Sequence, residues 1–265
     1  DIAAAWGVST LPAEAGRSSA EMIDAIHNDG LDALVIGGVD IADLPDAART
    51  TDAMKKAFVV SLEIAHSSVT EVADVVLPVA AIIEKSGSFQ DWQGSTRKFD
   101  KAIADSLSRS DVRILSMIAD EMGTPINLPT VAATAREIAA LGNWDGAAIS
   151  FEKTSAAKAI AAEGKMNLNS WRLLLDLGTL QDGEANLAGT ARKASARISK
   201  TRAEKIGVSE GELISISSDL GSLKLPVEIS EMSDNEIWVP RNSIGSTPLA
   251  TLNAVHGDLV TVVKA

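Results

Sequence analysis

The sequence predicts an α/β protein with a first domain built on a parallel sheet and a second domain that is a small β-barrel. Near the start, the helical pattern Ala20–Asn28 precedes the apolar run Leu34–Ile36 and then Gly37-Gly38, which is the order of a doubly wound α/β unit. Beyond residue 164 the hydrophobic period becomes two, as in Leu223–Ile229. The length of 265 residues is near the limit of a single core, about 250–300 residues, so two domains are expected.

Composition excludes several classes of function. The net charge of −12 disfavours binding to nucleic acids and to anionic membrane surfaces. No apolar run approaches the ~20 residues needed to span a bilayer, so no membrane insertion is expected. The chain has no cysteine, and its three histidines are far apart, so we expect no metal site in it. Because the chain begins at Asp1 without a secretory pattern, we expect a fragment or a processed chain.

The first domain is expected to occupy residues 1–142. Its sheet should contain the strands Leu34–Ile36, Phe58–Leu62 and Val75–Leu77, buried on both faces, with Pro78 ending the last. Ser68 and Glu71 have the spacing of a capping box and predict a helix before Val75. The other predicted helices are Ala20–Asn28, Ile41–Lys56, a helix capped by Asp111 and a helix from Val131 to Leu141. Each of the last two has an apolar stripe, from Ile114 to Met122 and from Val131 to Leu141, and both stripes should face the core.

A linker, residues 143–163, should lead to the barrel domain, residues 164–265. Short apolar strands separated by turns are typical of such barrels. The expected strands are Leu213–Ser217, Leu223–Ile229, Ile237–Pro240 and Leu259–Val263, with one short helix, Thr201–Ile206, ended by Gly207.

The loop Glu84–Thr96 is the natural place for a site, because ligands in open α/β sheets collect beyond the carboxyl ends of strands. It also fits a surface loop whose charges are solvated. Gly37-Gly38 either lets the backbone approach a phosphate or only permits a tight turn. No Walker A pattern, nucleophile elbow or acid–base pair is present, so no catalytic residue is assigned.

Three motifs in fixed order, ADVVLP, EKSGSF and WQG, resemble the signature of molybdopterin-dependent oxidoreductases. Near the end, AEKIGVSEG and IWVP resemble parts of the dinucleotide-binding double-psi barrel of that family. The resemblance implies a Rossmann-like α/β domain followed by a double-psi β-barrel. It is greatest to those members that serve as subunits of a respiratory NADH-oxidising complex.

The resemblance also implies positions for binding a pterin–guanine dinucleotide that carries molybdenum or tungsten. Asp91, Gln93 and Ser95 stand where the family has Asn, Glu and Arg, and the loss of a cation beside a gained carboxylate disfavours a pyrophosphate. We therefore expect that the cofactor-binding positions of the family are vestigial in this chain and that it binds no such cofactor. The family-like positions are Gly37, Gly38, Glu84, Lys85, Gly87, Asp91, Gln93, Gly94, Arg97 and Arg241.

Three functions follow as hypotheses. The first is a structural portion of a respiratory complex, bound to its other peripheral subunits at the cytoplasmic face of the membrane, with iron–sulfur clusters upstream of Asp1. The second is the C-terminal part of a true molybdopterin enzyme similar to formate dehydrogenases. The third is a separate interaction module with the same fold.

Overall fold

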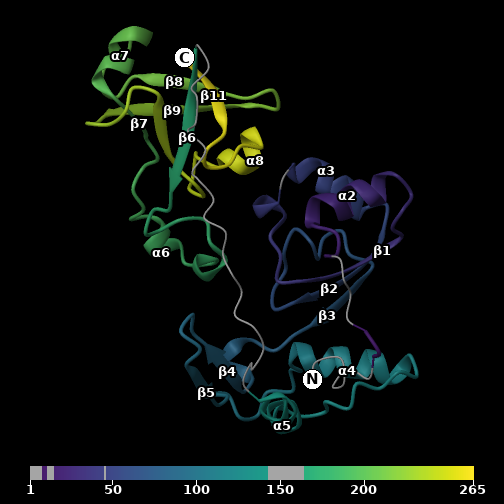
Figure 1. The fold of residues 1–265 in the computed structure, drawn as a ribbon. Helices are drawn as coiled ribbons and strands as arrows, with labels where there is room; N and C mark the ends of the chain where they lie inside the picture. The colour runs from purple at the N-terminus through teal and green to yellow at the C-terminus, as the bar shows by residue number, and fades with distance from the viewer. Residues whose placement is uncertain (1–7, 11–14, 45, 143–163) are drawn as a thin grey trace. The chain divides into compact units, whose positions relative to one another are not determined.

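The computed structural model describes residues 8–10, 15–44, 46–142 and 164–265. The chain divides into two compact units, one made of Asp1–Ile41 and Thr51–Glu152, the other of Ala42–Thr50 and Lys153–Ala265. Figure 1 shows a mixed α/β part and a barrel, which confirms the predicted fold class. The predicted linker, residues 143–163, lies outside the described residues, so the predicted domain limits stay a prediction.

A three-stranded parallel sheet forms the centre of the first unit. Strands β1 (Ala33–Gly37), β2 (Phe58–Glu63) and β3 (Val75–Pro78) lie in the order β1-β2-β3. In this register Val60 pairs with Val35 on one side and with Val75 on the other. The predicted strands and their parallel direction are confirmed.

Helix α2 (Ser19–His27) begins with a capping box in which Ser18 and Glu21 satisfy each other's backbone N–H. The predicted single helix Ile41–Lys56 is wrong, because it is divided into the 3-10 turn η1 (Ile41–Asp43) and helix α3 (Ala47–Met54). Asp46 causes the division, since its φ of 49° cannot continue a helix. Its carboxylate accepts the N–H of Arg49 at 3.0 Å instead and so starts α3.

The expected burial on both faces is not found along any strand of the sheet, since even in the central strand β2 Phe58 is 52% exposed. Val59 in β2 is fully buried, but Val35 in β1 is 66% exposed and Val76 in β3 is 42% exposed. The prediction was wrong because the described part of the chain covers only part of the surface of this sheet.

The predicted capping box of Ser68 and Glu71 is also wrong. Here the chain makes hydrogen-bonded turns and no helix. The reciprocal pair is formed one residue earlier, where Ser67 and Thr70 each accept the other's backbone N–H, at 2.8 and 3.3 Å. A threonine that bonds locally in this way stabilises a turn in place of a helix.

After the sheet the chain forms a 3-10 turn, a hairpin and two helices. The helices exist as predicted, although Ser110, and not Asp111, caps the first. The prediction that their apolar stripes face the core is wrong. Met122 is 75% exposed, and Leu115 and Ile138 are also exposed. Within the two helices, Ser116 is the one residue whose side chain is buried. The elements are η2 (Ile82–Glu84), β4 (Gly87–Gln90), β5 (Thr96–Phe99), α4 (Asp111–Glu121) and α5 (Val131–Leu141).

The second unit contains a closed six-stranded barrel with the order β10-β6-β11-β8-β9-β7. The pairs β10–β6 and β7–β9 are parallel, and the other neighbours are antiparallel, which is the mixed pairing of the predicted double-psi barrel. The strands are β6 (Lys165–Trp171), β7 (Ala196–Ile198), β8 (Leu213–Ser217), β9 (Ser222–Ile229), β10 (Glu236–Pro240) and β11 (Leu259–Lys264).

The barrel is filled by aliphatic side chains that alternate along each strand. Leu168, Ile214, Ile237 and Val260 are among those with no exposed surface. The predicted helix at residues 201–206 is confirmed as α7 (Lys200–Ile206), which ends at Gly207 in the left-handed conformation. The strand connections also contain the short helices η3 (Thr179–Gln181), α6 (Ala185–Ala188) and α8 (Pro248–Leu252).

Candidate functional site

The predicted loop Glu84–Thr96 is folded largely as the two-stranded hairpin β4–β5, whose tip is closed by Asp91. One carboxylate oxygen of Asp91 accepts the N–H groups of Gln93 and Ser95, both at 2.9 Å. The main-chain carbonyl of Asp91 accepts the N–H of Gly94 at 3.0 Å. Three consecutive N–H groups therefore point inward to Asp91, and the site where an outside anion could bind is filled by the chain's own carboxylate.

Glu84 has a structural role at the base of this hairpin. Its carboxylate accepts the hydroxyl of Ser106 at 2.7 Å, the N–H of Ala81 at 2.9 Å and the hydroxyl of Ser108 at 3.3 Å. These hydrogen bonds, that from Ser106 first, lower the pKa of Glu84 below its ordinary value of 4.5. An ionised, fully hydrogen-bonded carboxylate of this kind fixes the turn and is unsuited to take up a proton near neutral pH.

Lys85 is paired within the same unit. Its ammonium group lies 2.7 Å from the carboxylate of Asp111 at the start of α4. Partial burial, the largest single influence, raises the pKa of Asp111, but the hydrogen bond from Lys85, the hydrogen bond from the backbone N–H of Asp111 and the charge of Lys85 together outweigh it, so the net pKa is lowered. The positive charge of Lys85 is thus largely neutralised by the protein itself.

The glycines have separate structural reasons. Gly38 follows β1 and has a φ of 63°, the left-handed turn that glycine permits. At Gly87 a Cβ atom would lie 3.1 Å from the ring of Phe99, which stacks on Phe89 across the hairpin. Close packing explains Gly87 and turn geometry explains Gly38, without any ligand.

Two arginines complete the predicted set. Arg97 is exposed on β5, and Arg241 follows β10 in the barrel unit, where its N–H donates to the carbonyl of Trp171 at 2.7 Å. The structure brings Glu84, Lys85 and the hairpin residues together. It places Gly37 and Gly38 at the end of β1, separated from β3 by the intervening strand β2.

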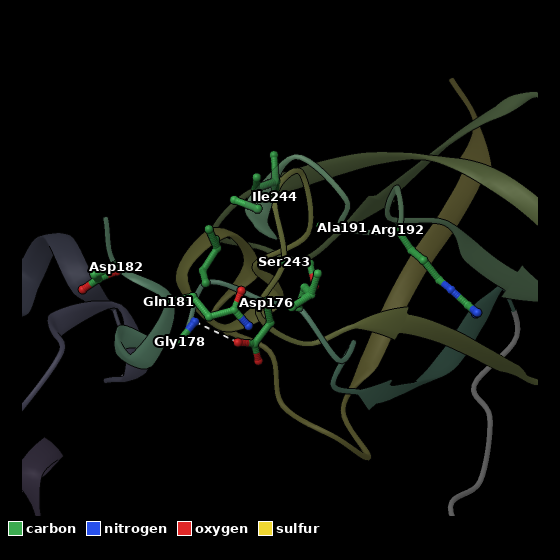
Figure 2. Close-up of a pocket in the computed structure, with 11 residues that line it drawn as sticks. Asp176, Gly178, Gln181, Asp182, Ala191, Arg192, Ser243 and Ile244 are labelled. Carbon is green, nitrogen blue, oxygen red and sulfur yellow. Dashed lines mark hydrogen bonds between the residues drawn. The ribbon is translucent and has the colours of Figure 1, made fainter. Parts of the chain in front are cut away.

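Sequence reasoning missed a cavity of about 120 Å³ in the barrel unit, beside the connection between β6 and β7 (Figure 2). Its least expected group is Ser243, which is only 3% exposed and whose Oγ has no hydrogen-bond partner among the described atoms. Asp176 accepts the N–H of Gly178 at 2.8 Å and lies 3.7 Å from Arg172. The lining residues are Leu175, Asp176, Leu177, Gly178, Gln181, Asp182, Ala188, Ala191, Arg192, Ser243 and Ile244. The glycines Gly178, Gly183 and Gly189, spread along a long strand connection, were a sequence signal for an irregular segment here.

Neither the hairpin nor the cavity fits a pterin dinucleotide. Such a ligand needs unused N–H donors for its phosphates, whereas the hairpin's donors serve Asp91. The cavity is smaller than the 300–1,000 Å³ typical of pockets for organic ligands, and its two carboxylates, Asp176 and Asp182, outnumber its one cationic side chain, Arg192, which disfavours phosphate.

The described part of the chain contains no cluster of three or more His, Asp or Glu side chains that could hold a metal ion. Within the same residues, no helix has both the length and the apolar character to cross a bilayer.

Comparison with known proteins agrees with this architecture. Residues 2–121 match the family model of the molybdopterin oxidoreductases. Acetylene hydratase from Pelobacter acetylenicus has a similar fold, with a TM-score of 0.54 and 14% identity over 93% of this chain and 46% of that structure.

More similar in sequence is the G subunit of the NADH-quinone oxidoreductase of Mycobacterium bovis, which is 42% identical over 98% of this chain. The corresponding subunit of Streptomyces coelicolor is 41% identical over 99% of it. The chain spans about one third of the length of these relatives, 33% and 32% respectively.

Proposed function

We propose that this chain is a structural, cofactor-free portion of the G subunit of NADH-quinone oxidoreductase, the respiratory complex that passes electrons from NADH to quinone. The observation that carries the proposal is 42% identity over 98% of the chain to that subunit of Mycobacterium bovis, extending through both units. The chain's lack of cysteine supports a location for the iron–sulfur clusters elsewhere in the polypeptide.

In this role the chain binds other peripheral-arm subunits on the cytoplasmic side of the membrane. The chain itself catalyses no reaction in this role and serves only to maintain the structure of the subunit. The inward-turned N–H groups at the tip of β4–β5 and the pairing of Lys85 with Asp111 support the absence of a phosphate-bearing cofactor.

Two measurements on the tagged parent subunit test the proposal. It should co-purify with a flavin- and cluster-containing assembly that oxidises NADH. Elemental analysis and the fluorescence of oxidised pterin should find no molybdenum, tungsten or pterin, with an active molybdopterin enzyme made in the same cells as the positive control. About one equivalent of pterin per chain would contradict the cofactor-free role and support the formate dehydrogenase-like alternative. Purification as a lone protein would support the separate interaction module.

A further inference from the structure

The cavity in the barrel unit lies between the β6–β7 connection and the turn that follows β10, and hydrogen bonds of the backbone hold its walls. The N–H of Leu177 donates to the carbonyl of Asn242 at 2.9 Å, which attaches the connection to the turn. Ser243 and Ser246 each donate their N–H to the other's carbonyl, at 2.9 and 2.8 Å. The backbone that carries the side chain of Ser243 is therefore fixed at the cavity.

Two polar side chains of the cavity are at least nine-tenths buried and have few partners. Ser243 is 3% exposed, and its Oγ makes no hydrogen bond with any described atom. The side chain of Asp176 is 10% exposed and accepts one hydrogen bond from the described residues, the N–H of Gly178 at 2.8 Å. Arg172, at 3.7 Å and 56% exposed, is too distant for a hydrogen bond and compensates the carboxylate weakly. Because an ionised carboxylate can accept about four hydrogen bonds, a nearly buried charge is left with unused acceptor sites.

A third acceptor comes from Gln181. Its Nε2 donates to the carbonyl of Leu174 at 3.4 Å, which leaves its Oε1 as an acceptor. Asp176, Gln181 and Ser243 are grouped in the centre of Figure 2, and all three line the cavity. The centre of the cavity therefore offers hydrogen-bond acceptors together with one negative charge.

The remaining lining is apolar or directed elsewhere. Arg192 and Asp182 lie to either side of the central group in Figure 2, with their charged ends away from it. The volume of about 120 Å³ equals about four water molecules, which is room for one small group. The other walls are largely aliphatic, from Leu175, Leu177, Ala188, Ala191 and Ile244.

We propose that this cavity binds a primary ammonium group on a short aliphatic stem. Such a group has three N–H donors and no acceptor, which matches the acceptors of Asp176, Gln181 and Ser243. The aliphatic walls suit the methylene groups of the stem. A calcium ion fits less well, since it takes 6–8 oxygen ligands and the centre of the cavity supplies one carboxylate. Two sources share the proposed chemistry, the side chain of a lysine from a neighbouring protein segment and a free alkylamine.

Calorimetric titration of the full-length subunit with n-butylammonium tests the binding. We expect saturable binding, and about tenfold weaker binding of butyltrimethylammonium, which has the same stem and charge but no N–H donor. Asp176→Asn keeps the shape of the side chain and removes its charge, so it should weaken binding of n-butylammonium about tenfold or more. The matched control is Asp182→Asn, the same substitution on the same cavity, which should change the affinity by less than about twofold because this carboxylate points away.

A lysine that already occupies the cavity would block this titration, so a second readout covers that case. The subunit, in whatever assembly it purifies with, is acetylated with acetic anhydride, and the modified lysines are located by mass spectrometry. A lysine bound in the cavity should be protected, and Asp176→Asn should raise its acetylation about fivefold, whereas Asp182→Asn should not. Such a lysine identifies a protein segment as the source; binding of n-butylammonium without one identifies a free amine.

Failure of both readouts would overturn the proposal and mean that the cavity holds water only. Equal affinity of Asp176→Asn and Asp182→Asn for n-butylammonium, with no protected lysine, would overturn it too. If Asp176→Asn does not fold, Ser243→Ala carries the same comparison, because it removes a hydroxyl that has no partner among the described atoms. The titration uses the subunit alone, so its result is independent of co-purification with an NADH-oxidising assembly and of the pterin content.

Discussion

The guanidinium group of Arg197 lies over the ring of Trp171, with Cζ 4.9 Å from the ring centroid, and its Nε lies 3.0 Å from the carboxylate of Glu228. The residues come from β7, β6 and β9. The contact joins strands that are not all neighbours, so it adds a link across the outer surface of the barrel.

Replacing Arg197 with alanine should lower the free energy of unfolding by about 1 kcal/mol, since a cation over an indole contributes roughly 0.5–1 kcal/mol at a partly exposed site and the ion pair adds little. Arg197→Lys keeps the charge but loses the flat stacking and should cost about half as much. Urea denaturation followed by tryptophan fluorescence measures both. Equal stability of Arg197→Ala and the unchanged chain would mean that the stacking is energetically neutral.

The central and edge strands of the first unit should respond differently to a buried charge. Val59→Asp places a carboxylate at a fully buried position and should cost more than about 3 kcal/mol. Val76 is 42% exposed, so Val76→Asp should lower the free energy of unfolding by only about 1 kcal/mol. This loss is smaller than the one expected if Val76 were buried on both sides. Chemical denaturation of the two variants compares them; the reverse order would mean that the sheet order is wrong.

Gly221 is the glycine with the least room in the described chain. A Cβ atom there would approach the carbonyl oxygen of Thr251 far inside van der Waals contact, and Thr251 is held in α8. Gly221→Ala should therefore lower stability by roughly 1–3 kcal/mol through forced displacement of the backbone. Gly16→Ala, where no atom lies within 4 Å, is the matched control and should change the melting temperature very little.

The pH dependence of stability should include a contribution from Glu84. Its pKa is lower in the folded chain than the ordinary 4.5, so its ionised form is stabilised by folding. This stabilisation is complete above pH 4.5 and is lost as the pH falls through the lowered folded pKa. Glu84→Gln removes the titration, so its stability should fall less steeply below pH 4.5 than that of the unchanged chain. Parallel slopes for the two proteins in acid would exclude this contribution.

Sequence patterns predicted the positions of helices and strands better than they predicted which of their side chains are buried. The strands around Val60 and Leu225 and the helix ended by Gly207 were foreseeable, because hydrophobic period and terminal glycines act within a few residues. The exposure of Val35, Val76 and Met122 was not foreseeable, because an apolar residue looks the same in the sequence whether or not a partner covers it in the structure.

The candidate site was foreseeable in position but not in structure. The strand–loop order located the segment after Pro78, and the departures at Asp91 and Ser95 suggested weak anion binding. That Asp91 would bind three N–H groups of its own turn depends on exact backbone geometry, which spacing alone does not encode. The buried hydroxyl of Ser243 was missed because its neighbours come from a distant part of the chain.

The pairing of β6 also has a consequence for synthesis on the ribosome. β6 lies between β10 and β11, and roughly 90 residues separate its end at Trp171 from Leu259, where β11 begins. At about 5–20 residues per second, β6 waits on the order of 5–20 s for this neighbour to be translated. During that interval its backbone donors and acceptors on one side have no final partner, so a nascent chain paused before Leu259 exposes a strand edge that can pair with another chain.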